Sequence, residues 1–220
     1  MPDDNARTPL LLELYEQYLE GQDSAAFAQK ASRSYNAGTL ERLTSHHQAE
    51  VRRAAVLAVG LLGDYLSNAC LGRALLDSDR CVRTLAESSI RAVWLRDGDE
   101  EDRRQLGVLV RLNAAQHYHE AISRAGELID RCPWLAEAWH QRAVAHFNLR
   151  QFAEAIRDCH ESLEINPYHF LAAASMGRAY LELQNPVSAL ESFRRALRLN
   201  ADMEGVRSHV VRLARLVEGS

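Results

Sequence analysis

Nine histidines are the residues of this 220-residue chain that are best suited to hold a metal ion. Zinc sites use such ligands at set spacings, for example two histidines four residues apart on one helix. His117 and His119 come closest, but side chains two residues apart on a helix point away from each other. His46 and His47 are adjacent in an expected turn between helices. We therefore predict that the chain has no metal site.

The cysteines also lack the spacing of a metal or redox site. No two of them form a C-x-x-C pair, and no histidine lies at zinc-finger distance from them. We expect buried, reduced thiols, which suit the cytoplasm. The four residues are Cys70, Cys81, Cys132 and Cys159.

Catalytic motifs are absent from the sequence. It contains no G-x-x-x-x-G-K-[ST], no G-x-G-x-x-G after a strand and no G-x-S-x-G. Glu161 and Glu164 are three residues apart on an expected helix, where Arg157 offers an ordinary ion pair, so a solvated helix face explains them. We therefore expect no catalytic residue, no cofactor and no enzyme activity.

The composition favours helices as the elements that carry these side chains. The chain has 32 alanines and 31 leucines, whereas valine, isoleucine and threonine together number 22. Helix-forming residues thus outnumber the β-branched ones, which predicts an all-α fold. Apolar residues make up 47% and charged residues 25%, a balance that excludes collagen-like, disulfide-rich and disordered chains.

The charge balance argues against a protein that binds nucleic acid. The formal net charge is −4, whereas nucleic-acid-binding proteins usually carry a basic excess. The alternative is an α-solenoid that binds nucleic acid through a local cluster near the C-terminus. That cluster consists of Arg194, Arg195, Arg198, Arg207, Arg212 and Arg215.

Targeting signals are not evident in the sequence. It begins with Met-Pro-Asp-Asp-Asn, which is acidic and unlike a signal peptide. The longest apolar run, residues 54–63, is far shorter than the roughly twenty residues of a membrane span. We expect a cytoplasmic protein without a membrane segment.

A regular spacing of about 34 residues runs through the C-terminal half. The aligned sets include Tyr118 with Phe152, Cys132-Pro133 with Asn166-Pro167, and Ala121 with Ala155 and Ala189. Repeats of this length are pairs of antiparallel helices that stack on their neighbours. We therefore predict an α-solenoid of about thirteen helices.

The residues at this spacing resemble the tetratricopeptide repeat family. That family has small, aromatic and proline residues at set places, here Trp139, Ala143, His146, Ala155, Cys159, Ser162 and Pro167, then Ala173, Gly177, Tyr180, Ala189, Phe193, Ala196 and Ala201. The closing proline is missing from the second set. The unit before, about 102–135, keeps only its second half clearly. Small residues are expected where paired helices cross, because a larger side chain would overpack the contact.

The last helix is expected to cap the stack. Its apolar residues are spaced to lie on one helix face, and its arginines on the other. The apolar residues are Val206, Val210, Leu213 and Val217, and the arginines are Arg207, Arg212 and Arg215.

The N-terminal half has a different period, of about 31 residues. Val51-Arg52 aligns with Val82-Arg83, and Ala55 with Ala86. Residues 50–64 resemble the second helix of a short HEAT repeat of the phycobilisome-lyase type, and Asp79 is placed to cap the following helix. The resemblance implies HEAT-like repeats over about 39–96.

Residues 8–37 match neither period. They predict two helices, about Pro9–Glu20 and Ser24–Ala37, with Pro9 in a first turn and Gly38 as a C-cap. The acidic stretch 97–102 separates the two halves. We therefore expect a helical cap at 1–38, HEAT-like repeats at 39–101, tetratricopeptide repeats at 102–203 and a capping helix at 204–220, joined in one stack.

The family resemblance also implies a binding surface. In tetratricopeptide arrays the first helix of each unit lines a concave face that holds peptides or helices. An apolar floor with a few polar groups suits a peptide groove. The alternative is that the same residues pack against the HEAT-like half or a neighbouring chain. The residues placed in the groove are His140, Val144, Phe147, Asn148, Leu171, Arg178 and Leu181.

The resemblance does not extend to the clamp of Lys, Asn and Arg with which chaperone-binding members hold a C-terminal carboxylate. The corresponding positions are Leu106, Val110, Gln141, Leu171 and Ser175. We predict a non-enzymatic scaffold or adaptor that binds a peptide or helix of another protein, with a few apolar anchors supplying most of the energy. A regulatory subunit of an enzyme complex is a further alternative.

Overall fold

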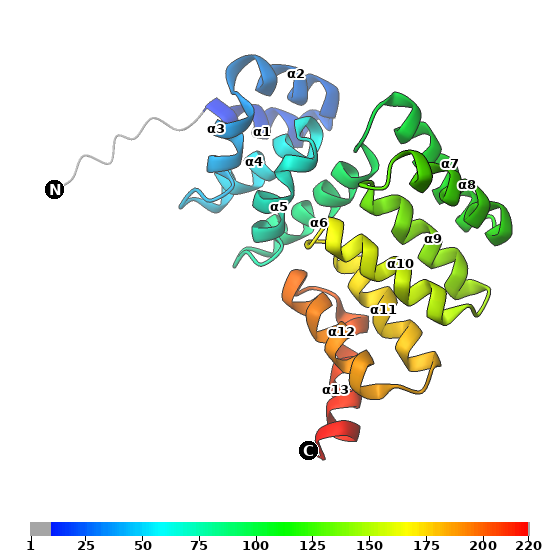
Figure 1. Ribbon diagram of the computed structural model, residues 1–220. Coiled ribbons are helices and arrows are strands. Elements are labelled where there is room, and N and C mark those ends of the chain that lie inside the picture. Colours follow the sequence, from blue (N-terminus) through cyan, green and yellow to red (C-terminus); the bar gives the residue numbers. More distant parts are fainter. Residues whose placement is uncertain (1–9, 220) are drawn as a thin grey trace. The chain divides into compact units, whose positions relative to one another are not determined.

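The computed structural model describes residues 10–219, apart from the side chain of residue 218. Every regular element in that range is helical: thirteen α-helices and one short 3-10 helix, η1 (Figure 1). The predicted all-α fold is therefore confirmed. The chain divides into two compact units, one through Val93 and one from Trp94. Pro9, which we expected in a first helical turn, lies outside the described residues.

The first unit contains α1 to α5, η1 and most of α6. The helices follow one another with short turns, and their apolar side chains form its core. Their bounds are α1 Leu10–Gly21, α2 Ser24–Ser34, α3 Ala37–Leu43, α4 Ala49–Leu62, η1 Tyr65–Ser67, α5 Asn68–Ala74 and α6 Arg80–Leu95.

The expectation that Gly38 ends a helix is wrong. The second helix already ends at Ser34, and the side chain of Asn36 accepts a hydrogen bond of 2.8 Å from the backbone N–H of Thr39. Asparagine is among the strongest N-cap residues. It therefore starts α3 at Ala37, and Gly38 lies in the first turn of that helix.

The period of the N-terminal half is visible in the contacts of the first unit. Two arginines one period apart each donate to two backbone carbonyls in the turn before their own helix. These contacts run from Arg52 to His46 and His47, and from Arg83 to Asp77 and Ser78. In both copies of the period, an arginine of the helix therefore fixes the preceding turn through the same pair of hydrogen bonds.

Two aspartates of the second copy form ion pairs with arginines of the first copy. Asp79 accepts from the backbone N–H of Val82 at 2.9 Å, which confirms its predicted role as a helix cap. The same carboxylate forms an ion pair of 2.6 Å with Arg53. Arg52 pairs with Asp77 at 2.7 Å through two hydrogen bonds. Bidentate pairs of this kind are the stronger class of ion pair.

The second unit contains the rest of α6 and seven further helices. From α7 to α12 they form consecutive antiparallel pairs, and α13 follows at the C-terminal end (Figure 1). Their bounds are α7 Glu100–Ala114, α8 Tyr118–Arg131, α9 Ala136–Asn148, α10 Phe152–Ile165, α11 Phe170–Glu182, α12 Pro186–Leu199 and α13 Glu204–Glu218.

The turn inside each helix pair has the same backbone conformation. Gln116, Arg150 and Gln184 have φ of 61°, 62° and 56°, in the left-handed region. Equal intervals in the sequence separate the three residues. Non-glycine residues rarely adopt this conformation. Its recurrence shows that the spacing found in the sequence is a structural repeat.

Between the pairs, the helices end where the sequence predicts. The eighth helix ends at Arg131 and α10 at Ile165, so Pro133 and Pro167 both follow a helix end. Proline disfavours helical conformation in the residue before it.

The small residues predicted for the helix crossings are buried, and one of them, Gly177, lies directly against the paired helix. Ala143, Ala155 and Ala189 are all buried. A Cβ atom built on Gly177 would lie 2.7 Å from a ring carbon of Phe193. Any larger residue at this position would therefore push α11 away from α12.

The last helix packs on the pair before it through part of its predicted apolar face. Leu213 is buried, and Val206 and Val210 are partly buried against the same core. Val217 differs, because it is 37% exposed.

Candidate functional site

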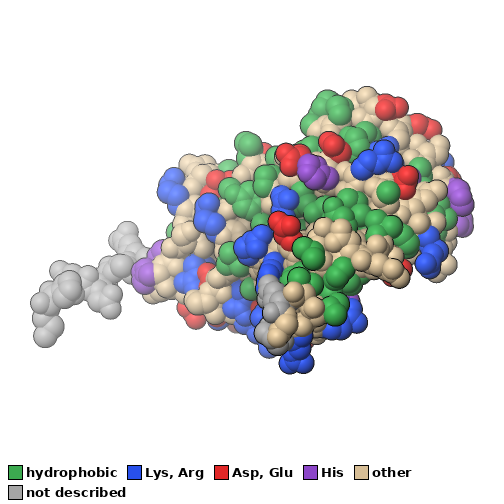
Figure 2. All heavy atoms as spheres, turned by 60° about the horizontal axis from the view of Figure 1, so that its bottom comes forward, with side chains coloured by type: hydrophobic (Ala, Val, Ile, Leu, Met, Phe, Trp, Pro, Cys, Tyr) green, Lys and Arg blue, Asp and Glu red, His purple; other side chains and the backbone are tan. Residues whose placement is uncertain are grey.

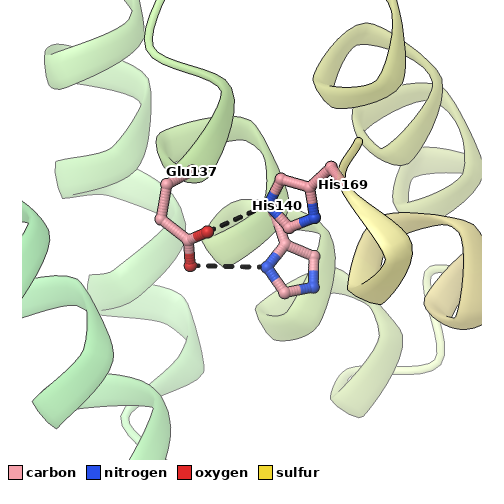
Figure 3. A group of neighbouring side chains, drawn as sticks. All are labelled: Glu137, His140 and His169. Carbon is pink, nitrogen blue, oxygen red and sulfur yellow. Dashed lines mark hydrogen bonds and ion pairs between the residues drawn. The ribbon is translucent and has the colours of Figure 1, made fainter. Parts of the chain in front are cut away.

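Three polar residues of the tetratricopeptide-like half are buried together, and we call them the Glu137 cluster: Glu137, His140 and His169. Glu137 and His140 lie one turn apart in α9, and His169 precedes α11 (Figure 3). One carboxylate oxygen of Glu137 lies 2.9 Å from Nε2 of His169. The other lies 3.5 Å from Nδ1 of His140 and accepts from Gln141 at 2.6 Å. The cluster thus links the first helices of two successive pairs.

Hydrogen bonds define the tautomer of His169. Its Nδ1 atom accepts from the backbone N–H of Ala172 at 3.1 Å, which makes His169 the side-chain cap of α11. An atom that accepts this bond carries no proton, so in the neutral ring the proton lies on Nε2. That proton points to Glu137, and both nitrogens are satisfied.

The protonation states follow from burial and from these bonds. Burial alone would raise the pKa of Glu137, but hydrogen bonds from His140 and His169 hold it well below its usual range. Burial lowers the pKa of His169, against the opposing effect of Glu137. The cluster is therefore a buried carboxylate that is stabilised by N–H donors.

The same three residues are a possible donor set for a metal ion, since their ligand atoms lie within 4.8 Å of one another. Two histidines and one glutamate also form known zinc sites. However, a metal on Nε2 of His169 would move the proton to Nδ1, which would then face the N–H of Ala172. Binding would cost the cap of α11. The donor set therefore does not fit a metal ion in this geometry, and we assign the cluster to the core.

Aromatic rings cover the cluster. Trp94 stacks on His169 with ring centroids 4.1 Å apart, and His140 lies 4.6 Å from the same ring. His169 has no exposed surface, and His140 is 5% exposed. His140, which we placed in the groove, is therefore buried in the Glu137 cluster and not on the surface.

The other residues predicted for the groove stay closer to the surface. Val144, Phe147, Leu171 and Leu181 are half-buried, whereas Asn148 and Arg178 are exposed. Within this set the polar groups bond locally. Asn148 donates to the carbonyl of Val144 at 2.8 Å, and Arg178 donates to Ser175 at 3.0 Å.

One of the seven, Leu181, lines an open cavity, which we call the α11–α13 cavity. It has a volume of about 830 Å³ and lies between the end of α11, the start of α12 and one face of α13. Hydrophobic and basic side chains lie close together on this part of the surface (Figure 2). The lining residues are Leu181, Gln184, Pro186, Ser208, Val211, Arg212, Leu213, Arg215 and Leu216.

The wall that α13 contributes follows a helical stripe. Ser208, Val211, Arg212, Arg215 and Leu216 are spaced i, i+3, i+4, i+7 and i+8, which places them on one face. Val211 is 49% exposed and Leu216 is 70% exposed. Sequence reasoning assigned this face to solvent because of its arginines. The two hydrophobic residues outside the buried stripe were the signal that could have revealed it.

Two of the five positions that correspond to the carboxylate clamp are buried, and a third takes part in side-chain hydrogen bonds within the chain. Leu106 and Ser175 are buried, and Gln141 accepts from Asn113 at 2.8 Å while it donates to Glu137. No helix in the described residues is long and apolar enough to cross a membrane.

Comparison with known proteins identifies repeats in the second half of the chain. Tetratricopeptide repeat family models match residues 136–169 and 172–203. The chain is 29% identical over 89 residues to small glutamine-rich tetratricopeptide repeat-containing protein 2 of Saccharomyces cerevisiae, covering 40% of this chain and 26% of that protein. It is 32% identical over 87 residues to human DnaJ homolog subfamily C member 7, covering 40% of this chain and 18% of that protein. The chain thus spans about a quarter or less of these relatives.

A solved structure agrees on the fold. The first tetratricopeptide domain of Spaghetti (RPAP3), bound to the HSP90 peptide SRMEEVD, matches with a TM-score of 0.52 and 21% identity. The match covers 55% of this chain and 96% of that one. The helix pairs α9–α10 and α11–α12 are therefore tetratricopeptide repeats.

Proposed function

We propose that this chain is a non-enzymatic scaffold or adaptor that binds a segment of another protein on the first helices of its tetratricopeptide repeats. The observation that carries the proposal is the α11–α13 cavity, whose hydrophobic wall includes Leu181, a residue predicted for the groove. Cavities of several hundred Å³ with apolar walls and a few polar groups are typical binding sites.

The solved relative supports a peptide as the ligand. It carries an HSP90 peptide, whereas the clamp positions here include Leu106, Val110 and Leu171. We therefore propose a ligand that is held by apolar anchors and not by its terminal carboxylate. Burying one large apolar side chain in such a cavity contributes roughly 1.5–3 kcal/mol, so two or three anchors supply a large part of the energy that must offset the cost of association.

A selection experiment tests this function. A phage-displayed library of random 16-residue peptides is selected on the immobilised chain, and the enriched peptides are titrated against the wild type and variants. Leu181→Glu is expected to weaken binding at least tenfold, because it places a charge in the apolar wall. Leu183→Glu is the matched control, since Leu183 is 49% exposed and does not line the cavity.

Two outcomes would contradict the proposal. Either the selection enriches no peptide, or the enriched peptides bind the Leu181→Glu variant as tightly as the wild type. Circular dichroism of each variant checks that the helices are retained.

Further features of the chain are also proposals. We propose that residues 39–101 form HEAT-like repeats, which the equivalent contacts of Arg52 and Arg83 support.

Three free, buried cysteines support a reducing compartment such as the cytoplasm, and burial raises the pKa of one of them, Cys70, to about 11. We do not propose nucleic-acid binding, because Arg212 and Arg215 line an apolar cavity and the net charge is −4.

A further inference from the structure

We infer that the α11–α13 cavity binds an amphipathic helix of a partner protein whose apolar stripe is flanked by carboxylates. This inference rests on the proposed function and names the chemistry of the partner. It is carried by the distribution of charge and apolar surface on α13.

The first argument is charge. Arg212 and Arg215 line the cavity, and none of its described lining residues is acidic. Arg212 lies 3.3 Å from His209 on the same helix. Burial lowers the pKa of His209, and the positive charges of Arg212 and Arg178 lower it further. The two guanidinium groups in the cavity lining favour an occupant with carboxylates.

The second argument is the shape of the apolar surface. Val211 and Leu216 are five residues apart on α13, so they lie at the two edges of the face that lines the cavity, and Leu181 contributes a further apolar side chain from α11. Helices dock in such grooves through residues at i, i+3, i+4 and i+7. In a solenoid each helix pair buries the apolar face of its neighbour. A partner helix would cover this face of α13 in the same manner.

The third argument is the amount of hydrophobic surface left open around the cavity. Leu216 is 70% exposed and Val211 is 49% exposed, and both line the cavity. Adjacent exposed hydrophobic residues of this size mark interaction sites more often than single ones do. Such a site needs a partner that supplies apolar anchors as well as charge, which excludes a purely acidic tail.

Three designed peptides test the inference. The acidic probe is an 18-residue helix-forming peptide with leucines at i, i+3, i+4 and i+7 and glutamates beside them. The second replaces each glutamate by lysine, and the third keeps the glutamates but replaces each leucine by glutamine. Fluorescence anisotropy measures their affinity for the full chain at low and at moderate salt.

We expect the acidic probe to bind at least tenfold more tightly than both others, with an affinity that falls as salt increases. The double variant Arg212→Glu/Arg215→Glu should reverse the preference, so that the lysine peptide binds more tightly. Because this reversal is a gain of binding, it cannot arise from a variant that fails to fold. Arg198→Glu, an exposed α12 residue that does not line the cavity, is the matched control and should leave the preference unchanged.

The inference is overturned if the acidic and lysine peptides bind equally, or if neither binds. It is also overturned if light scattering shows that the chain dimerises and that Leu216→Glu makes it monomeric, because the occupant is then a second copy. If library peptides still bind in a manner sensitive to Leu181→Glu, the proposed function survives and only the partner chemistry is wrong. If they do not, both fail.

Discussion

The two ends of α11 show opposite ways of using the same repeat surface. At its N-terminal end the Glu137 cluster is closed, with both ring nitrogens of His169 bonded and Trp94 stacked on that ring. At its C-terminal end Leu181 faces an open cavity of about 830 Å³. The closed end contributes to stability and the open end offers binding surface. A family resemblance alone assigns the same role to both.

This contrast predicts which substitutions unfold the chain and which only remove binding. The largest effect is expected at the closed end, from Glu137→Ala. The substitution leaves the buried N–H of His169 without its acceptor and removes the acceptor of the partly buried Gln141 amide, and each unsatisfied donor costs about 1–3 kcal/mol. Urea unfolding measures the loss. Glu161→Ala, on the exposed face of α10, should change stability by less than about 0.5 kcal/mol.

The second substitution lies between the two ends. Gly177→Ala places a methyl group 2.7 Å from Phe193 and is expected to cost about 1–3 kcal/mol through overpacking. Because α11 carries both regions, its displacement should also weaken peptide binding. Gly205→Ala has nothing within 4 Å and should be neutral or stabilising. If the Gly177→Ala variant unfolds at the same urea concentration as the wild type and binds peptides as tightly, the contact between Gly177 and Phe193 constrains neither end of α11.

Sequence reasoning predicted the repeated helix pairs of the C-terminal half but not the difference between the two ends of α11. The regular spacing of the C-terminal half predicted the repeated helix pairs, and the small residues predicted where the helices cross. Both are local signals that any copy of the repeat carries. The burial of His140 depends on His169, which comes from the next pair, and on Trp94, which precedes the repeats. Such contacts between distant segments leave no local pattern.

The cavity was missed for a different reason. A helix with one buried apolar stripe and several arginines reads as a solvated cap. Here α13 carries a second stripe, which includes Val211 and Leu216 next to Arg212 and Arg215. Only the packing of Leu213 and its neighbours decides which stripe is buried.

The third prediction concerns pH and the closed end. His169 has a lowered pKa, so the folded state prefers the neutral ring that caps α11. Its contribution is fully present above the ordinary value of about 6.5 and is lost as the pH falls below it, at no more than about 1.4 kcal/mol per pH unit. Glu137 stays ionised throughout this range, because its pKa is lowered.

The test compares unfolding free energies between pH 7.5 and 5.5. His169→Asn keeps a capping side chain but no longer titrates, so its stability should fall less steeply than that of the wild type. His160→Asn, on the exposed side of α10, is the control for the substitution. Equal slopes for the His169→Asn variant and the wild type would show that the closed end does not sense pH.

The smallest effect on stability is expected at the open end. Leu216 is 70% exposed, so Leu216→Glu should change the unfolding free energy by less than about 0.5 kcal/mol. The same variant should lose affinity for selected peptides by at least tenfold. A large loss of stability would mean that this face is part of the core and not a docking surface.

The left-handed turns at Gln116, Arg150 and Gln184 have the same backbone conformation, so successive helix pairs begin and end in equivalent ways. A segment that begins and ends at equivalent points of such a series can be duplicated without a new kind of junction. Residues 136–169 contain all three members of the Glu137 cluster. An inserted second copy would therefore carry its own equivalent of the Glu137 cluster and would lengthen the array by one repeat. The α11–α13 cavity would keep the same lining residues. The length of the array and the ligand of the cavity could therefore be varied independently.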